Sequence, residues 1–256
     1  LMVDGQLVKE VFMHVVGLIP SRLNSARLPS KALLTIDGLP LVVHTMKRAQ
    51  LSESLDDVYV CTDSEEIGEA VIKHGGKYIM TSSDHINGTE RIAEASKDME
   101  VDLIVDIQGD EPLIDPAHID IVVKKHFEQP EWDIVIPSLP VVKPESPHIV
   151  KVVHDTSFKI VYLSRAIVPQ PFRRRPNYYL KHLSIISFRS EALQKFASLP
   201  PSSLELAEGI ELLRALENGL ILGTVILDGS SFSVDIEEDY IKAKEQMLKD
   251  EIRKQY

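Results

Sequence analysis

Three cationic side chains, Arg22, Arg27 and Lys31, lie in one short segment that reads PSRLNSARLPSK. Arginine presents a planar fork of donors, lysine presents a compact charge, and backbone amides of a turning loop add further contacts to an anion. A solvated basic surface loop would have the same composition. Because the segment directly follows the apolar run 14–19, which is typical of a strand, we favour a polyphosphate site.

Carboxylates follow a second apolar run, in the sequence LIVDIQGDEP. It places Asp106, Asp110 and Glu111 at the end of a predicted strand and just beyond it. Magnesium takes one or two protein carboxylates and completes its shell with water and substrate phosphates, so Asp110 alone would be an ordinary ligand. Asp115, which precedes a helical pattern, is better interpreted as a helix cap.

A third acidic position, Asp235, stands in SFSVDIEEDY, after an apolar run and directly before a helical pattern. Asp is a common N-cap residue, and the glutamates that follow suit the positive end of a helix dipole. Asp is equally a magnesium ligand. The local sequence leaves helix capping and metal binding both open for Asp235.

Together these segments suggest phosphoryl-group chemistry in which a basic loop holds a polyphosphate, magnesium neutralises it and a hydroxyl attacks phosphorus. Such a transfer requires no nucleophilic side chain, and Ser21, Ser25 and Ser30 lack a neighbouring histidine and acid in the sequence. Neither GxGxxG nor GxxxxGK[ST] occurs in the chain, which counts against dinucleotide-dependent redox chemistry and P-loop hydrolysis.

Composition restricts the class of protein further. A chain of 256 residues with 44% hydrophobic content can form one large core, or one core with a smaller lobe. A net charge of -11 argues against nucleic-acid and anionic-membrane partners, so a bound polyanion should be small. The chain has no apolar run of roughly 20 residues and no basic-then-apolar opening, which predicts a cytoplasmic protein. The lone Cys61 is predicted to be a packed core residue.

The first half alternates β-branched runs with helical patterns, which predicts crossovers between parallel strands. Sheets of this kind bind ligands just beyond the carboxyl ends of their strands, where the segments 20–31, 82–91 and 108–112 fall. The predicted strands are 14–19, 57–62, 77–80, 102–107 and 133–138, and the predicted helices are 41–50, 65–75 and 89–98.

Prolines interrupt the second half, and its apolar runs 149–155, 158–164 and 182–188 predict antiparallel additions to the sheet or a small lobe. A helix over about 203–218, a strand over 220–227 and a charged helix over 236–256 complete the prediction. The basic turn Arg173–Pro176 is interpreted as a solvated turn, with a lid over substrate as the alternative.

Eight segments, in this order between about Val15 and Met247, resemble the 3-deoxy-manno-octulosonate cytidylyltransferases, the CMP-Kdo synthetase family. They are LIPSRLNSARLPSKAL, TSSDHINGTERIAE, VDIQGDEPLI, VKVV, YLSRA, KHLSI, LELAEGIELLR and SVDIEED. The resemblance implies that the 2-hydroxyl of an acidic sugar attacks the α-phosphorus of CTP, with Mg²⁺ as cofactor and pyrophosphate as leaving group. It also implies a homodimer.

The resemblance further implies an α/β fold, with a doubly wound, mostly parallel sheet and a smaller antiparallel lobe for sugar binding and dimerisation. The nucleotide-binding region would span 14–137 and the lobe 138–227. The segment 228–256 would supply a metal-ligand loop and a helix that completes the main domain.

Site residues follow from the same resemblance, position by position. Arg22, Arg27 and Lys31 match the positions of the triphosphate loop, and Gln108 matches a nucleotide contact. Asn87 and Gly88 match the segment that borders cytosine, and Asp110 and Asp235 match the magnesium ligands. Arg165, His182 and Glu211 match positions of the sugar site. Among these, Arg22, Lys31, Asp110 and Asp235 are the predicted catalytic residues. Without the resemblance, His182 would be interpreted as a strand histidine with a satisfied hydrogen bond.

Two sugar-site positions depart from the family pattern. Ile186 stands where the pattern has tyrosine, and Leu212 stands where it has glutamine. A hydroxyl left unpaired on burial costs roughly 1–3 kcal/mol. The resemblance implies Kdo or a modified Kdo such as 8-amino-Kdo, and the two departures lead us to expect a modified octulosonate or another acidic sugar.

Three alternative functions remain open at this point. The chain could activate another α-keto acid sugar, such as a nonulosonate. It could also be an inactive nucleotide-binding module, because a fold does not establish a function. A sugar-nucleotide dehydrogenase would fit the alternating strands and helices, but the missing glycine fingerprint counts against it.

Overall fold

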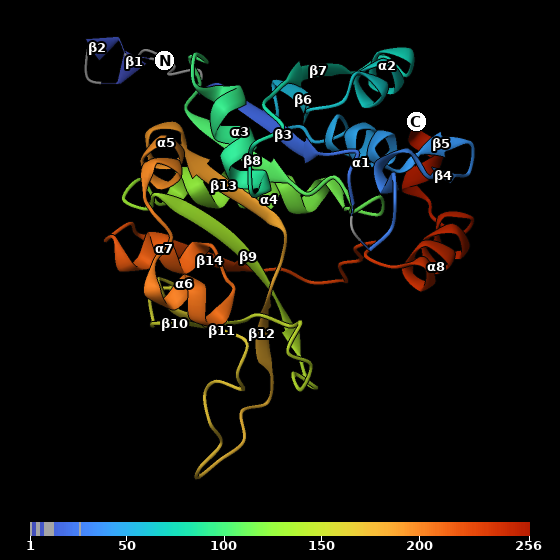
Figure 1. Cartoon of the computed structure of the whole chain (residues 1–256). Helices are drawn as coiled ribbons and strands as arrows, with labels where there is room; N and C mark the ends of the chain where they lie inside the picture. The colour runs from blue at the N-terminus through green and yellow to red at the C-terminus, as the bar shows by residue number, and fades with distance from the viewer. Residues whose placement is uncertain (1, 4–5, 8–12, 26) are drawn as a thin grey trace.

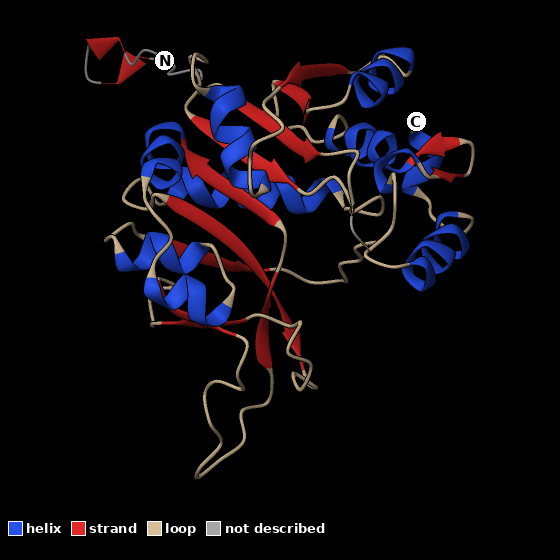
Figure 2. Ribbon diagram, viewed as in Figure 1, coloured by secondary structure: helices blue, strands red, loops and turns tan. Residues whose placement is uncertain are grey.

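The computed structural model describes residues 2–3, 6–7, 13–25 and 27–256. A ten-stranded sheet runs through it, with helices packed on both faces (Figures 1 and 2). Its strands are β3 (Val15–Ser21), β6 (Asp57–Thr62), β7 (Lys77–Met80), β8 (Leu103–Ile107), β9 (Ile134–Val141), β10 (Lys151–His154), β11 (Ile160–Ser164), β12 (Tyr179–His182), β13 (Ile185–Arg189) and β14 (Leu222–Ile226).

Most helices are short. They are α1 (Leu41–Ala49), α2 (Glu65–Lys73), α3 (Gly88–Ser96), α4 (Pro116–Glu128), α5 (Ser190–Ser198), α6 (Ser203–Glu208), α7 (Leu212–Glu217) and α8 (Glu237–Met247), with 3-10 turns η1 (Lys31–Leu33) and η2 (Ile252–Gln255). Two small hairpins lie outside the main sheet. They pair β1 (Met2–Val3) with β2 (Gln6–Leu7), and β4 (Thr35–Ile36) with β5 (Leu39–Pro40).

The strand order is β11-β10-β12-β9-β13-β8-β3-β6-β7, and β14 pairs with β9. Strands β7, β6, β3 and β8 are parallel, as the first half of the sequence predicts. Strand β13 enters antiparallel between β8 and β9, while β14 is parallel to β9. Two strands from the range 138–227 are thus hydrogen-bonded into the central sheet, and β12, β10 and β11 extend it as antiparallel strands.

Each face of the sheet carries its own apolar core, because side chains alternate across a strand. On β3, Val16 and Leu18 join the core beneath α3, α5 and α7, whereas Val15 and Ile19 join the core beneath α1, α2 and α4. Cys61 belongs to the first of these cores and is fully buried, which confirms its predicted packing role. Burial raises the pKa of its thiol.

Two helix predictions in the second half are wrong in extent. The predicted helix 203–218 is two helices, α6 and α7, because Gly209 adopts φ +62° and ends α6 in a left-handed cap. The predicted helix 236–256 ends at Met247 and is followed by the separate turn η2. The break at Gly209 matters for the site, since it turns the chain back toward the sheet.

The segment between β11 and β12 projects from the body of the protein (Figure 1). Arg173, Arg174 and Arg175 are exposed on it, and Arg175 Nη2 lies 3.4 Å from Glu145 Oε1. This exposure agrees with a solvated turn. Among the described residues, no helix combines the length and the apolar character that crossing a membrane requires.

A buried histidine beneath α4 gives a pH prediction. The His126 Nδ1 atom lies 2.7 Å from the Ser187 hydroxyl and Nε2 lies 3.0 Å from the Trp132 carbonyl, an arrangement that a neutral ring satisfies on both sides. Burial lowers the pKa of His126 to about 4. Below pH 6.5 this histidine takes up a proton in the unfolded chain but stays neutral in the folded chain. The free energy of unfolding should therefore fall as the pH drops from 6.5 to 4.

The gap between these two pKa values corresponds to up to about 3 kcal/mol. Urea unfolding between pH 4 and pH 7 would measure this loss for the wild type and for His126→Gln, which cannot take up the proton. We expect a shallower pH dependence in the variant. Equal dependence in both proteins would contradict the assignment.

Candidate active site: two adjoining pockets

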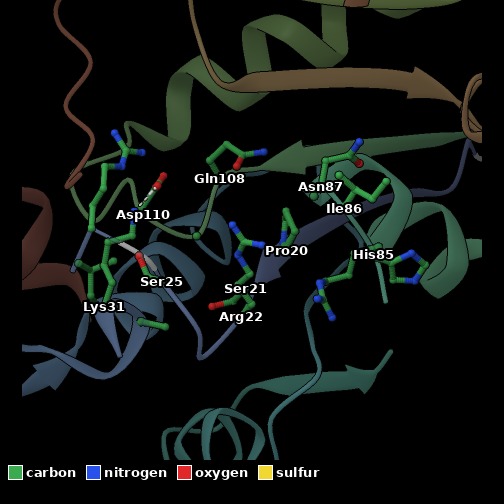
Figure 3. Close-up of a pocket in the computed structure, with 16 residues that line it drawn as sticks. Pro20, Ser21, Arg22, Ser25, Lys31, His85, Ile86, Asn87, Gln108 and Asp110 are labelled. Carbon is green, nitrogen blue, oxygen red and sulfur yellow. Dashed lines mark hydrogen bonds and ion pairs between the residues drawn. The ribbon is translucent and has the colours of Figure 1, made fainter. Parts of the chain in front are cut away.

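The first pocket lies at the carboxyl end of β3 and has a volume of about 270 Å³. The predicted loop cations Arg22, Arg27 and Lys31 line it, and Figure 3 shows Arg22 and Lys31 at its edge. Residues from other parts of the chain also line it, among them His85, Asn87, Gly88, Arg91, Gln108 and Asp110. The predicted phosphate loop and the predicted nucleotide contacts therefore meet around a single cavity.

Two of the loop cations are held by the two predicted magnesium ligands. The Lys31 Nζ atom lies 2.6 Å from Asp110 Oδ2 and 3.8 Å from Asp235 Oδ1, and it donates to the Val234 carbonyl at 2.8 Å. The Arg27 Nη2 atom lies 2.7 Å from Asp235 Oδ1. Residues that are far apart in the sequence thus converge from the basic loop, the turn after β8 and the segment before α8.

The question of whether Asp235 is a helix cap is decided by this arrangement. The N-cap of α8 is Ile236, and no side chain accepts a capping hydrogen bond there. The Asp235 carboxylate instead faces the loop cations. Asp115, by contrast, caps α4 by accepting from the Ala117 amide at 2.9 Å, as predicted.

Asp110 and Asp235 fit a divalent cation in their donor chemistry. Their carboxylate oxygens approach the same ammonium group of Lys31, so they converge on one small positive centre. No cluster of three or more His, Cys, Asp or Glu suited to a metal was found among the described residues. Two carboxylates nevertheless meet the requirement of magnesium, which completes its shell with water and substrate phosphates.

Packing of the C-terminal segment positions Asp235. Val234, Ala243 and Met247 bury their side chains in one cluster with Leu28, which lies in the basic loop, and Leu41, which begins α1. The Val234 amide also donates to the Asp110 carbonyl at 2.9 Å. The segment before α8 is therefore tied to both walls of the first pocket.

Glycines allow the loops around this pocket to approach each other. A Cβ atom at Gly109 would lie 2.9 Å from the Pro20 carbonyl oxygen, and one at Gly88 would lie 3.0 Å from Pro20 Cγ. Asn87, directly before Gly88, caps α3 by accepting from the Glu90 amide at 2.8 Å. Gly109 was not predicted from the sequence as a site residue, although its position between Gln108 and Asp110 could have indicated one.

A second missed residue is Arg91, which lines the first pocket and is almost fully buried. Its Nη2 atom pairs with Asp63 at 3.0 Å, while Nη1 donates to the Thr81 hydroxyl at 2.5 Å and to the Ser82 carbonyl at 3.2 Å. Arg91 therefore fixes the segment after β7 against the end of β6. Its position on the same helix as Gly88 could have indicated this role.

The second pocket has a volume of about 340 Å³ and adjoins the first. Gly88, Gln108 and Asp110 line both pockets. Four of the residues expected at the sugar line the second one, namely His182, Ile186, Glu211 and Leu212. Asp235 also lines it, so both predicted metal ligands border the second pocket.

Titratable side chains in the second pocket are strongly influenced by burial. Burial raises the pKa of Asp106 well above its usual value, and the nearby Glu211 carboxylate raises it further. Burial also raises the pKa of Glu211, although the Thr89 hydroxyl donates to its Oε2 at 3.0 Å. The sequence analysis assigned Asp106 to the strand end only, whereas the structure places it in this pocket.

His182 is not the satisfied strand histidine of the simpler interpretation. Its Nε2 atom is buried and has no hydrogen-bond partner among the described residues. Burial lowers the pKa of the ring to about 4, so the imidazole is neutral near pH 7. A buried polar atom without a partner is costly, so the Nε2 atom is a position where a bound group can form a hydrogen bond.

Arg165 does not line either pocket. Its Nε donates to the Glu208 carbonyl at 2.7 Å, Nη2 to Gly209 at 3.0 Å and Nη1 to Pro147 at 3.0 Å. Its expected contact with the sugar remains a prediction, and in this structure the guanidinium holds the break between α6 and α7. Because Gly209 lines the second pocket, Arg165 supports its wall.

Similar proteins were found by sequence and by structure. A family model described as Cytidylyltransferase matches residues 16–228. The 3-deoxy-manno-octulosonate cytidylyltransferase of Chlorobium limicola is 42% identical over 235 residues, which cover 89% of this chain and 94% of the relative. The 8-amino-3,8-dideoxy-manno-octulosonate cytidylyltransferase of Shewanella sp. (strain W3-18-1) is 38% identical over 244 residues, which cover 92% and 99%.

A solved structure of CMP:2-keto-3-deoxy-manno-octonic acid synthetase complexed with CTP has the same fold, with a TM-score of 0.89 and 33% sequence identity. The superposition covers 92% of this chain and 99% of that one.

Proposed function

Because the chain belongs to the cytidylyltransferase family, among the 3-deoxy-manno-octulosonate cytidylyltransferases, we propose that it transfers CMP from CTP to an octulosonate sugar acid. The acceptor is 3-deoxy-manno-octulosonate or its 8-amino derivative, the sugars named for two of its relatives. The sugar 2-hydroxyl attacks the α-phosphorus, the bond from that phosphorus to the β-phosphate bridge breaks, and pyrophosphate leaves. The hydroxyl proton passes to solvent.

The observation that carries this proposal is the common wall of the two pockets. A nucleotide in the first pocket and a sugar in the second would both border Gly88, Gln108 and Asp110. Direct transfer requires the attacking oxygen and the phosphorus to be held close together. Two pockets that share a wall meet this requirement without a covalent intermediate on the protein.

The roles of the residues follow from their charges. Arg22, Arg27 and Lys31 would bind the phosphates, and Lys31 would exchange its contact with Asp110 for a phosphate oxygen. Asp110 and Asp235 would hold Mg²⁺, which when bound supplies neutralising charge to the phosphates. His182 and Glu211 would orient polar groups of the sugar in the second pocket.

A homodimer belongs to the same proposal. The second half exposes large apolar side chains on and beside its projecting segment, among them Phe172, Val161 and Tyr178. Large apolar side chains exposed in one region of a protein support an interface there. With CTP and a free sugar as substrates, the proposed reaction takes place in the cytoplasm.

Pyrophosphate release tests the proposed function. The reaction contains CTP and Mg²⁺ with 3-deoxy-manno-octulosonate, its 8-amino derivative, a nonulosonate or no sugar. We expect release with an octulosonate only. Release with the nonulosonate alone would show that the acceptor is a nonulosonate and not an octulosonate. CTP binding without release from any sugar would indicate an inactive nucleotide-binding module.

A further inference from the structure

The charges in the second pocket are distributed unevenly. Four carboxylates line it, whereas no Arg or Lys belongs to its described lining. Asp110 and Asp235, on the side of the first pocket, are paired with Lys31 and Arg27. The other two, Asp106 and Glu211, form no ion pair with a described residue, although both border a cavity proposed to hold a sugar.

Hydrogen bonding does not saturate these two carboxylates either. Both oxygens of Asp106 accept from one donor, the Gln108 Nε2 atom, at 3.1 and 3.0 Å. Glu211 Oε2 accepts from the Thr89 hydroxyl, and no described side chain donates to its Oε1. Because an ionised carboxylate has about four acceptor positions, both groups retain capacity for further donors.

Their immediate neighbours cannot supply those donors. Ile186 lies directly opposite Asp106 in the pairing of β13 with β8, and Leu212 follows Glu211 in the chain. Both aliphatic side chains line the same pocket, together with Val150 and Ile210. Asp106 is almost completely buried. Ionising both carboxylates in these partly apolar surroundings is costly unless a ligand provides a cation.

A further polar group in the pocket also lacks a partner. The His182 Nε2 atom is buried and unpaired among the described residues, and it belongs to a ring that burial keeps neutral. This observation is independent of the carboxylates and also favours a ligand with hydrogen-bonding groups. The pocket thus offers open hydrogen-bonding positions on three side chains, two of which are carboxylates.

We propose that Asp106 and Glu211 form a subsite for an ammonium group, so that the substrate is an acidic octulosonate carrying an amino substituent. This inference rests on the proposed function and selects between its two acceptors. An ammonium group donates three hydrogen bonds and compensates the two negative charges, whereas a hydroxyl in its place donates one and compensates none.

The experiment compares kcat/KM for 8-amino-3,8-dideoxy-manno-octulosonate and for 3-deoxy-manno-octulosonate, with CTP and Mg²⁺ in excess and pyrophosphate release as the signal. The proteins are the wild type, Asp106→Asn and Glu211→Gln, which keep side-chain size while removing charge. Glu217→Gln is the matched control, because Glu217 ends α7, does not line the pocket and accepts a hydrogen bond from the Leu204 amide. Calorimetric binding of CTP reports on the fold of each variant.

We expect the wild type and Glu217→Gln to prefer the amino sugar. Charged hydrogen bonds of the usual strength correspond to a loss of about 10- to 100-fold in this preference for each pocket variant, through a higher KM for the amino sugar. A wild type that prefers the hydroxyl sugar, or a preference that neither variant changes, would overturn the inference while leaving the proposed function intact. No release from either sugar would instead reject the proposed function.

Discussion

The Asp110→Ala variant is expected to release pyrophosphate at least about 1,000-fold more slowly than the wild type. Asp110 borders both pockets and is the residue on which the predicted metal site and the Lys31 contact converge. Removing a carboxylate that holds a catalytic metal reduces the charge stabilisation of the transition state by several kcal/mol. The measurement is the initial rate of release over a series of Mg²⁺ concentrations.

Asp115→Ala is the matched control for this loss, because Asp115 follows the same strand but only caps α4. We expect it to cost about 1 kcal/mol of stability and to keep its activity. The assignment of Asp110 fails if Asp110→Ala retains more than a tenth of the wild-type rate. It also fails if the wild type and Asp110→Ala require the same concentration of Mg²⁺.

Replacing Lys31 by Met should lower kcat/KM for CTP by about 100- to 1,000-fold. The Lys31 ammonium lies between Asp110 and Asp235 in a mostly buried position, so it is a fixed positive charge at the place proposed for the phosphates. Loss of one preorganised group that stabilises developing negative charge reduces rates by this order. Steady-state kinetics at varied CTP concentration would separate a change in KM from a change in kcat.

Lys77→Met is the control with the same change of side chain. Lys77 pairs with Asp57 at the surface, away from both pockets, and its side chain is 57% exposed. Exposed ion pairs contribute little to stability, so the Lys77→Met variant should have the kcat and KM of the wild type. If Lys31→Met also lies within about twofold of the wild type, the basic loop does not act on the phosphates in the proposed way.

Local sequence was sufficient for the first half of the fold. The strands β3, β6, β7 and β8 and the helices α1, α2 and α3 agree closely with the periodicity of their apolar residues. Parallel strands buried on both faces produce uninterrupted apolar runs, and amphipathic helices separate them. The rule that ligands bind beyond the carboxyl ends of such strands then located the basic loop and the QGDEP turn.

Periodicity was less informative in the second half. Strand β13 lies inside the main sheet between β8 and β9, although its chain position suggested either an addition or a lobe. Antiparallel pairing of this kind joins segments about 80 residues apart, which no local pattern encodes. The sequence did not predict the break at Gly209. A glycine can lie inside a helix or end it at positive φ, and which of the two occurs depends on how the following segment packs.

By itself, the sequence determined the chemistry available to this protein: a cationic loop after one strand, carboxylates after another, and the resemblance that connects them to CTP. Only the tertiary structure decided which of these groups share a cavity. Asp235 became a partner of Lys31 rather than a helix cap, Arg165 became a support of the pocket wall, and Asp106 became part of the second pocket. The physical reason is that residue type fixes charge and hydrogen-bonding capacity, whereas distance and burial depend on packing between segments remote in the chain.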